Sequence, residues 1–359
     1  MERVSRIQQA DRARRFGGGL PAAVLAVVVF AAWVDAGVGG ETVVRCGDDL
    51  ATAAAALLAA VVCARAARRQ AGRLRLFWSL LAAASAAWSL GELLWALYDL
   101  ILLGSVPVPS WADAGYLAAI PLAAAALLVH PAMRGRSTGK TRAVLDGLVI
   151  ASALFFLFWT LLLGPLWRAT DLTTLGGLVA LAYPIGDVVV VLLVVLVIRG
   201  TSNQARRDLW YLLAGLLAIT CSDAVYGYLS EVKGYATGNL IDTGWVVGYL
   251  AIALAAHASR TEQSTEPAPI ANTLSPAAIV APFLPMLAAL SLAAVRVELG
   301  HRLGRVGLTT AFLLVAVVLI RQALLVLDLA KSRNTDHAPI GDRLLTAVGA
   351  PAPTVRSRR

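Results

Sequence analysis

The sequence predicts an all-α integral membrane protein with ten transmembrane helices, arranged as two parallel four-helix repeats followed by a C-terminal helix pair. Composition is the first reason, because 58% of the 359 residues are apolar, only 15% are charged and the mean hydropathy is +0.73. Soluble domains have about 45–50% apolar and about 25% charged residues. A disordered chain, a disulfide-rich secreted scaffold and a nucleic-acid-binding domain are therefore poor descriptions of this protein.

Apolar runs of the length of a membrane helix follow one another along the chain. About 20 helical residues cross the roughly 30 Å of hydrocarbon in a bilayer. The runs that reach or approach this length cover residues 18–38, 47–64, 76–103, 111–130, 143–166, 175–198, 209–230, 240–257, 276–295 and 306–320. These runs are the ten predicted spans.

The segments that join these spans are alternately rich and poor in basic residues. Most of the 31 Lys and Arg residues fall in the N-terminal segment, in every second loop and in the C-terminal segment. More than half of the 22 acidic residues fall on the opposite side. Cytoplasmic loops carry the excess of Lys and Arg. We therefore expect a multi-pass protein of the cell membrane with both termini in the cytoplasm, and we interpret the net charge of +9 as a sign of orientation.

A weak internal repeat divides the first eight spans into two groups of four. Residues 76–82 resemble residues 208–214, and the span that each segment opens carries an acidic residue near its outer end, Glu92 or Asp223. The period is about 130 residues, and an even number of spans in each copy makes the two copies parallel rather than inverted.

The predicted organisation has six parts. They are a basic cytoplasmic N-terminus (1–17), a first four-helix repeat (18–130), a second four-helix repeat (131–258), a polar cytoplasmic linker (259–275), a C-terminal transmembrane helix pair (276–330) and a disordered cytoplasmic tail (331–359). The linker and the tail contain several Pro and polar residues, a composition that does not favour a packed core.

Carboxylates and aromatic rings share helical faces in the outer half of the predicted bundle. Trp88, Glu92, Trp95 and Asp99 are spaced four, three and four residues apart, so they form one stripe along the third span. Ring faces and carboxylates both attract positive charge, so this stripe suits a cationic or hydrogen-bond-donating ligand. The candidate ligand-binding residues are Glu92, Asp187, Asp223, Trp88, Trp95, Asp99, Asp113, Tyr183, Tyr226, Asp242, Trp245 and Tyr249.

Asp187 is the candidate that lies deepest in the predicted hydrocarbon. It is about 18 Å along its helix from Arg199, which marks the inner end of the span. A carboxylate at such a depth is costly, and it marks a functional site by default. Pro184 and Gly186 precede it, which predicts a kinked or interrupted helix.

Structural roles compete with ligand binding at several positions. Asp113 and Asp242 stand three residues after a Ser and an Asn, the spacing of a capping box, so each can cap a helix instead. Asp48 and Asp49 open the second span, and there we favour a cap. Outer Trp and Tyr side chains can form an interfacial aromatic belt, and buried carboxylates can join helices by hydrogen bonds. Arg321 is expected to reach the lipid headgroups.

The sequence contains no catalytic or cofactor motif. No nucleophile elbow is present, because the Gly-x-Ser-x-Gly match at residues 135–139 joins two predicted helical spans and follows no strand. The HExxH zinc motif, the phosphate loop and the dinucleotide fingerprint are missing. Cys46, Cys63 and Cys221 are neither paired nor spaced for a metal. His130 and His257 end two equivalent spans, where haem ligation is one interpretation and an interfacial position is the favoured one. We expect no enzymatic activity, no metal and no cofactor.

Four short motifs lie between residues 75 and 330. They are Tyr183-Pro184-x-Gly186-Asp187, Ser222-Asp223-x-x-Tyr226, Asp242-x-Gly244-Trp245-x-x-Gly248-Tyr249 and Arg321-Gln322. Together they resemble the multi-span N-terminal sensor region of actinobacterial GGDEF and EAL cyclic-di-GMP signalling proteins. The resemblance implies a sensing module whose last span leads to a cytoplasmic diguanylate cyclase or phosphodiesterase domain. This chain has no GGDEF or EAL signature, and the roughly 30 residues after Ala330 are too few for such a domain, so enzymatic output is not expected from it.

These observations favour an integral membrane sensor-like binding protein with an acidic and aromatic cavity in its outer half. The expected partners are the lipid bilayer, a small ligand for which a cation is favoured, and a cytoplasmic signalling protein or a second copy of the chain. No nucleic acid is expected. A secondary transporter of a small metabolite or cation is the alternative, although such exporters usually have five-plus-five inverted repeats. A membrane assembly subunit that binds no ligand is a third interpretation.

Overall fold

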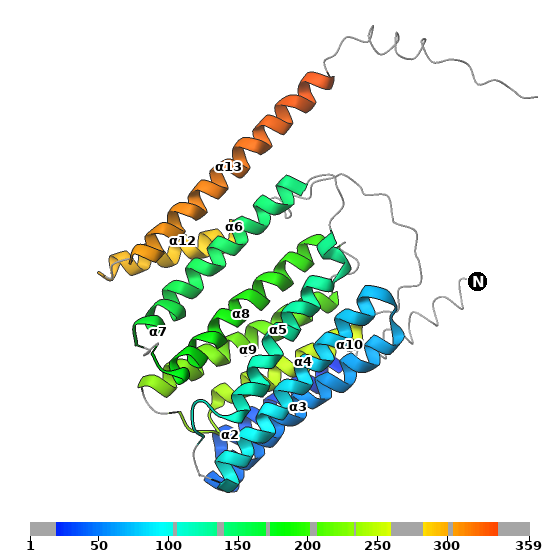
Figure 1. Ribbon diagram of the computed structural model, residues 1–359, viewed down its shortest axis with the longest axis vertical. Coiled ribbons are helices and arrows are strands. Elements are labelled where there is room, and N and C mark those ends of the chain that lie inside the picture. The colour runs from blue at the N-terminus through cyan, green and yellow to red at the C-terminus, as the bar shows by residue number, and fades with distance from the viewer. Residues whose placement is uncertain are drawn as a thin grey trace, which may run out of the picture.

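The computed structural model describes residues 19–102, 106–134, 140–169, 173–201, 207–232, 235–259, 283–300 and 304–336. Within these residues every regular element is a helix (Figure 1). The predicted N-terminal segment, nearly all of the predicted linker and most of the predicted tail lie outside the described residues.

Among the described residues, eight helices are long and apolar enough to cross a membrane. They are Gly19–Ala36, Glu41–Arg69, Gly72–Leu102, Trp111–Val129, Leu175–Ile198, Asp208–Gly227, Leu240–Ala258 and Arg305–Leu324. The all-α class and the multiple helices of membrane-spanning character are confirmed, whereas the count of ten spans stays a prediction.

The fifth and ninth predicted spans are helical where the structure describes them, but neither is among the eight helices that are long and apolar enough to cross a membrane. The fifth covers α6 (Lys140–Phe158), the π-helical segment η3 (Trp159–Leu163) and α7 (Gly164–Ala169), and its apolar part is Leu148–Leu161. The described part of the ninth is α12 (Phe283–Glu298), which has 16 residues. A helix of that length extends about 24 Å, which is short of the roughly 30 Å of a hydrocarbon core.

Six helices form a closed ring that holds the main core. Each of them packs on the next one along the chain, and the last packs back on the first. The ring runs in the order α3 (Glu41–Arg69), α4 (Gly72–Ala96), α5 (Trp111–Val129), α8 (Leu175–Gly200), α9 (Arg207–Val232) and α10 (Thr243–Ala258). The helix α2 (Gly19–Ala36) packs against α10 from outside the ring. Trp78, Phe77 and Leu212 are among the largest fully buried side chains of this core.

Glycines close two of the helix crossings in the ring. Where α4 meets α5, a Cβ added to Gly115 would lie 2.7 Å from the backbone oxygen of Ala87. Where α9 meets α10, a Cβ added to Gly244 would lie 2.0 Å from the hydroxyl oxygen of Ser222. Small residues allow helix backbones to approach closely inside a membrane. Both crossings therefore depend on the absence of a side chain.

The C-terminal helix pair packs on α6 and forms a second, smaller core. Both α12 and α13 (Arg305–Asp336) contact α6, and Figure 1 shows these three helices grouped on one side of the ring. The buried residues of this core are Val149, Ala153, Phe156, Ala289 and Leu314. The helix α6 also contacts α8, so it joins the three-helix group to the ring.

One local prediction about these helices is wrong, and of the kink or interruption predicted before Asp187 the interruption is not found. Arg321 is only 1% exposed, so it lies inside the protein and not among lipid headgroups. The helix α8 continues through Pro184, so it is not interrupted ahead of Asp187. A proline removes one backbone hydrogen bond, which a helix held by neighbours on both sides can tolerate.

Candidate functional site

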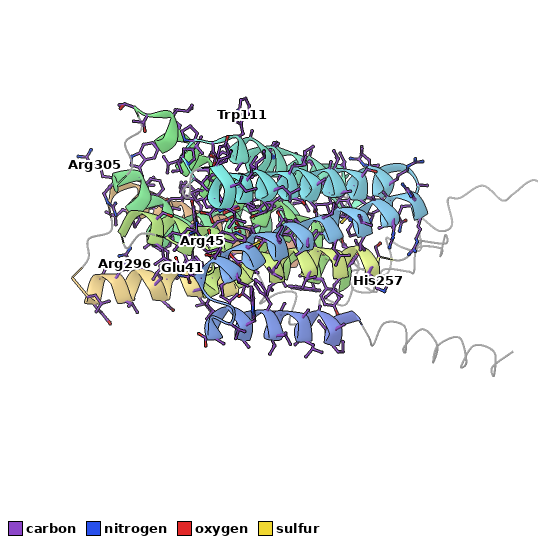
Figure 2. All side chains as sticks on the ribbon, turned by 90° about the horizontal axis from the view of Figure 1, so that it is seen from below. Glu41, Arg45, Trp111, His257, Arg296 and Arg305 are labelled. Carbon is purple, nitrogen blue, oxygen red and sulfur yellow. The ribbon has the colours of Figure 1, made fainter. Side chains whose placement is uncertain are left out.

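A cavity of about 520 Å³ lies inside the ring, toward the end at which α3, α5, α8 and α10 begin. Figure 2 shows Glu41 and Arg45 of α3 toward this end and His257 of α10 toward the other. Side chains from all six ring helices line the cavity. The cavity therefore exists because the six helices close into a ring, and no single pair of helices could enclose it.

Acidic and aromatic side chains dominate the lining, and no basic side chain is among the described residues that form it. The carboxyl groups belong to Asp48, Asp49, Glu92, Asp113 and Asp223. The rings belong to Trp88, Trp95, Tyr116, Tyr183, Tyr226, Tyr235 and Trp245. The predicted site residues found in this lining are Glu92, Asp223, Trp88, Trp95, Asp113, Tyr183, Tyr226 and Trp245.

The stripe predicted on the third span is present over its first three residues. Trp88, Glu92 and Trp95 of α4 all face the cavity, and the indole N–H of Trp88 donates to Oε1 of Glu92 at 2.8 Å. Glu92 is only 7% exposed. The ring of Tyr116 on α5 packs against Trp88 at a centroid distance of 4.7 Å. Helical periodicity therefore placed these side chains correctly.

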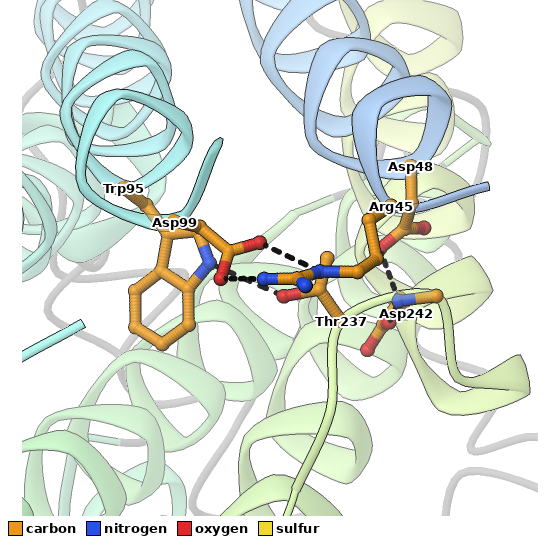
Figure 3. A network of polar contacts seen from close by, with 7 residues as sticks. Arg45, Asp48, Trp95, Asp99, Thr237 and Asp242 are labelled. Atoms are coloured by element: carbon orange, nitrogen blue, oxygen red, sulfur yellow. Dashed lines mark hydrogen bonds and ion pairs between the residues drawn. The ribbon is translucent and has the colours of Figure 1, made fainter. Parts of the chain in front are cut away.

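Asp99 leaves this stripe and does not line the cavity. The backbone after Ala96 forms the π-helical segment η1 (Leu97–Leu102), which widens the turn and shifts the face that Asp99 presents. Its carboxylate accepts two hydrogen bonds from the guanidinium of Arg45, one of them from Nε at 3.2 Å (Figure 3). This ion pair joins the start of α3 to η1, which follows α4, and Asp99 neutralises the positive charge of Arg45.

Asp223 has a tryptophan partner, as Glu92 has. The indole N–H of Trp245 on α10 donates to Oδ1 of Asp223 on α9 at 2.8 Å. Asp187 on α8 interacts with Asp223 from the neighbouring helix and borders a small cavity of about 60 Å³, which Tyr249 also lines. Oδ2 of each residue is buried and receives no hydrogen bond from an N–H or hydroxyl donor, so the two carboxyl groups are each other's partners. Asp187 and Tyr249 therefore lie beside the large cavity and not in its lining.

The two predicted capping boxes are present, and each carries a second role. Asp113 closes the box with Ser110, and its Oδ1 accepts a hydrogen bond from the Tyr183 hydroxyl at 2.6 Å. Asp242 closes the box with Asn239, and its Oδ1 accepts from the Tyr235 hydroxyl at 2.9 Å. Asp242 is fully buried and lies behind the cavity lining, whereas Asp113 lines the cavity.

Asp48 and Asp49 are cavity residues that the sequence interpretation assigned to a cap. The helix α3 begins at Glu41, so both residues lie well inside it, and each is only 3% exposed. Oδ2 of Asp48 accepts the backbone N–H of Gly238 at 3.2 Å, and the Asp48 carboxyl group also interacts with that of Asp242, whereas Oδ2 of Asp49 is buried without a partner. The predicted span began at residue 47, where the apolar run begins, so it left out the more polar first turns of the helix.

The aromatic residues of the site pack on one another. Tyr226 contacts Tyr235 at a ring centroid distance of 4.7 Å and Trp245 at 5.9 Å. Trp111 and Trp167, by contrast, are 73% and 51% exposed, as an interfacial belt requires. Tyr235 was not predicted, because it lies in a loop where no periodic pattern could place it.

Burial changes the acid–base behaviour of two groups outside the spanning helices. It raises the pKa of the Tyr235 phenol, and the negative charge of Asp242 raises it further. Burial lowers the pKa of His130 to about 4. His130 is therefore neutral at physiological pH, packs edge-on against Phe77, and accepts the backbone N–H of Ala132 through Nδ1 at 3.2 Å. These contacts give it a structural role inside the protein.

No family model, curated protein or solved structure matches this chain. The resemblance to the sensor region of cyclic-di-GMP signalling proteins therefore stays a prediction. Among the described residues, no group of three or more His, Cys, Asp or Glu side chains is arranged to hold a metal ion.

Proposed function

We propose that this protein is an integral membrane binding protein whose cavity takes a small cationic ligand and reports its presence to a cytoplasmic partner. One observation carries the proposal: the cavity combines carboxyl groups with Trp and Tyr rings and has no basic side chain among its described lining residues. Carboxylates supply charge, and the faces of aromatic rings add cation–π attraction.

The charge balance of the cavity supports a cation rather than a neutral ligand. Removing a carboxylate from water costs several kcal/mol unless it gains a partner of opposite charge. Arg45, the basic residue nearest to the α3 carboxylates, is bound to Asp99. A cationic ligand would supply the missing positive charge and would also satisfy the unpartnered Oδ2 of Asp49.

Helix contacts offer a route from the cavity to the C-terminal helices. Tyr183 and Pro184 place α8 in the cavity wall, α8 contacts α6, and α6 contacts α12 and α13. The helix α13 continues as far as Asp336, beyond the apolar segment that ends at Leu324. Ligand-dependent movement of α8 would thus be passed to a helix that projects beyond the bilayer, where a signalling protein or a second copy of the chain would respond.

Ligand-dependent melting of the full-length protein in detergent tests the proposal. Choline should raise the melting temperature by several degrees, since a ligand at about 100 times its Kd stabilises by about 2.7 kcal/mol. Dimethylbutanol, the uncharged carbon analogue of choline, should not. Glu92→Gln and Asp223→Asn should lose the choline effect, whereas Asp35→Asn, on the exposed face of α2, should retain it. Equal stabilisation by choline and dimethylbutanol would exclude a cation site.

Transport is the second candidate function, and the order of helices in the ring favours it. The neighbours α3, α4 and α5 come from the first predicted repeat, and α8, α9 and α10 come from the second. Two parallel repeats around a central site also describe some transporters. Uptake of radiolabelled choline by sealed proteoliposomes separates the two functions, because this permanent cation crosses lipid slowly. A transporter should accumulate it, whereas a sensor should bind it without uptake.

A further inference from the structure

Two carboxyl groups from distant parts of the chain are hydrogen-bonded to each other beside the cavity. They belong to Asp48 of α3 and to Asp242 of η5 (Leu240–Asp242), the turn that leads into α10. The backbone N–H of Gly238 donates to Oδ2 of both residues, at 3.2 Å to Asp48 and at 3.0 Å to Asp242 (Figure 3). Carboxylate oxygens only accept hydrogen bonds, so one carboxyl group of such a pair must be protonated. The Asp48–Asp242 pair therefore holds one proton.

The proton of this pair lies on Asp48, because other donors hold Asp242 as a carboxylate. Oδ1 of Asp242 accepts from the Tyr235 hydroxyl at 2.9 Å, and Oδ2 also accepts the backbone N–H of Asn239 at 2.8 Å. Donors of this kind stabilise the ionised form. Oδ1 of Asp48 is buried and receives no N–H or hydroxyl donor, which suits an oxygen that carries a proton. Asp48 lines the cavity, whereas Asp242 lies behind the lining, so the proton is on the cavity side of the pair.

The next residue of α3, Asp49, marks the place for a cation. Its side chain is 3% exposed and lines the cavity, and its Oδ2 is buried without a partner. A buried polar atom without a partner is unusual in a folded protein, and a ligand that is absent from the coordinates commonly explains it. Arg45, one turn earlier on α3, does not fill this role because Asp99 binds it.

The surroundings of these three carboxyl groups oppose a further negative charge. The charged and titratable side chains that act on Asp48, Asp49 or Asp242 come from α3, α4, η1, α5, α9 and the segment before η5. They are Arg45, Glu92, Asp99, Tyr116, Tyr226 and Tyr235. Arg45 is the base in this set, and Asp99 neutralises it. Ionisation of Asp48 beside Asp49 and Asp242 therefore calls for a positive charge from outside the protein.

We infer that the cavity exchanges a proton for a cation, so that a small ammonium ion binds at Asp48 and Asp49 as the proton of the Asp48–Asp242 pair leaves. The O–H bond of Asp48 breaks, its electron pair stays on the oxygen, and the proton passes to water in the cavity. The three carboxyl groups carry two negative charges before the step. Three negative charges and one ammonium ion follow it, so the net charge is conserved. This inference rests on the proposed cation-binding function and adds to it the proton that each cation displaces.

Proton release by the full-length protein in detergent tests the exchange. One proton should appear for each choline bound, measured with phenol red in weakly buffered solution. Calorimetric titration in phosphate between about pH 6 and pH 8 should show a choline affinity that rises about tenfold per pH unit, because a higher pH favours the state that has lost the proton. Choline binding without proton release and with an affinity independent of pH would overturn this inference alone. Failure of choline to bind at any pH in this range would also overturn the proposed function.

An amide substitution identifies the group that gives up the proton. Asn has the shape of a protonated Asp and also donates a hydrogen bond, so Asp48→Asn keeps the contact with Asp242 but has no proton to release. This variant should bind choline with an affinity that does not change with pH, whereas Asp35→Asn, on the exposed face of α2, should behave as the wild type. Proton release that persists in Asp48→Asn, or that is lost in Asp187→Asn instead, would overturn the assignment to Asp48.

Infrared difference spectra of the wild-type protein give a readout that does not depend on the folding of a variant. A protonated carboxyl group has a carbonyl band that a carboxylate lacks. This band should weaken when choline is added, as Asp48 loses its proton. A spectrum in which choline binds and the band is unchanged would overturn the exchange.

Discussion

The six-helix ring and the three-helix group of α6, α12 and α13 bury different chemistry. The ring encloses a cavity with carboxyl groups, and it satisfies many of them with Trp and Tyr donors and with capping boxes. The core cluster of the three-helix group consists of apolar side chains, with Leu314 and Phe156 each 1% exposed, although α13 also buries Arg321 and Thr310. Polar interiors specify particular partners, whereas an apolar helix contact is less specific about orientation. The proposed binding function therefore involves the ring, and the proposed transmission involves the three-helix group.

Close glycine crossings add to this contrast, whereas π-helical segments occur in both regions, as η1 after α4 and as η3 after α6. In the ring, Gly115 and Gly244 lock two helix crossings at close range. In the three-helix group, α6 leads into the π-helical segment η3 and then α7. Tight glycine contacts resist sliding, and π-helical turns often occur where a helix has a functional role. The predictions below test this division, from the largest expected effect to the smallest.

Filling a glycine crossing should disrupt the ring most strongly. Gly115→Val places side-chain atoms against the backbone of α4, which cannot move aside as a flexible side chain could. We expect a loss of about 3 kcal/mol or more, or failure to assemble, detected as a shifted or absent monodisperse peak in gel filtration. Gly227→Ala is the control, because no atom lies within 4 Å of the added Cβ. Equal behaviour of the two variants would show that the crossing is not tightly packed.

Truncating the small core should weaken the three-helix group without affecting the ring. Leu314→Ala removes a side chain that is 1% exposed, so we expect a loss of about 2–5 kcal/mol. Phe312→Ala, two residues away on the same helix and 74% exposed, should change stability by less than about 0.5 kcal/mol. Choline binding should survive in both variants. Loss of binding in Leu314→Ala would show that the two regions form one cooperative unit.

Acid should destabilise the protein through His130. The pKa of about 4 in the folded protein lies below the roughly 6.5 of an unfolded histidine, so the unfolded chain binds more protons between these values. Stability contributed by neutral His130 is thus complete above about pH 6.5 and is lost as the pH falls toward 4. We expect a loss of roughly 1–2 kcal/mol over this range, measured by thermal melting. The melting temperature of His130→Gln should depend less on pH, and parallel profiles would contradict the assignment.

The Arg45–Asp99 ion pair should make the smallest contribution. Arg45 is 26% exposed, so water screens part of the attraction, and we expect a coupling energy of about 1 kcal/mol or less. A double-mutant cycle with Arg45→Gln and Asp99→Asn measures it, and the coupling should fall in high salt. A coupling of several kcal/mol that resists salt would instead indicate that this pair controls access to the ring.

Local sequence patterns predicted shared helix faces and helix caps correctly. Spacing along α4 predicted that Trp88, Glu92 and Trp95 share a face, because an α-helix repeats every 3.6 residues whatever lies around it. The capping boxes of Asp113 and Asp242 were recognisable because the groups that they join lie within three residues.

The sequence by itself determined the all-α class, the several membrane-spanning helices and these local features, because composition and short-range spacing encode them. Only the tertiary structure decided which carboxyl groups meet in the cavity. Asp48 and Asp49 belong there because α3 begins at Glu41 and α10 packs back on α3. Asp99 is excluded because Arg45, 54 residues earlier, binds it. Such contacts depend on how six helices close into a ring, and periodicity along one helix carries no information about its neighbours.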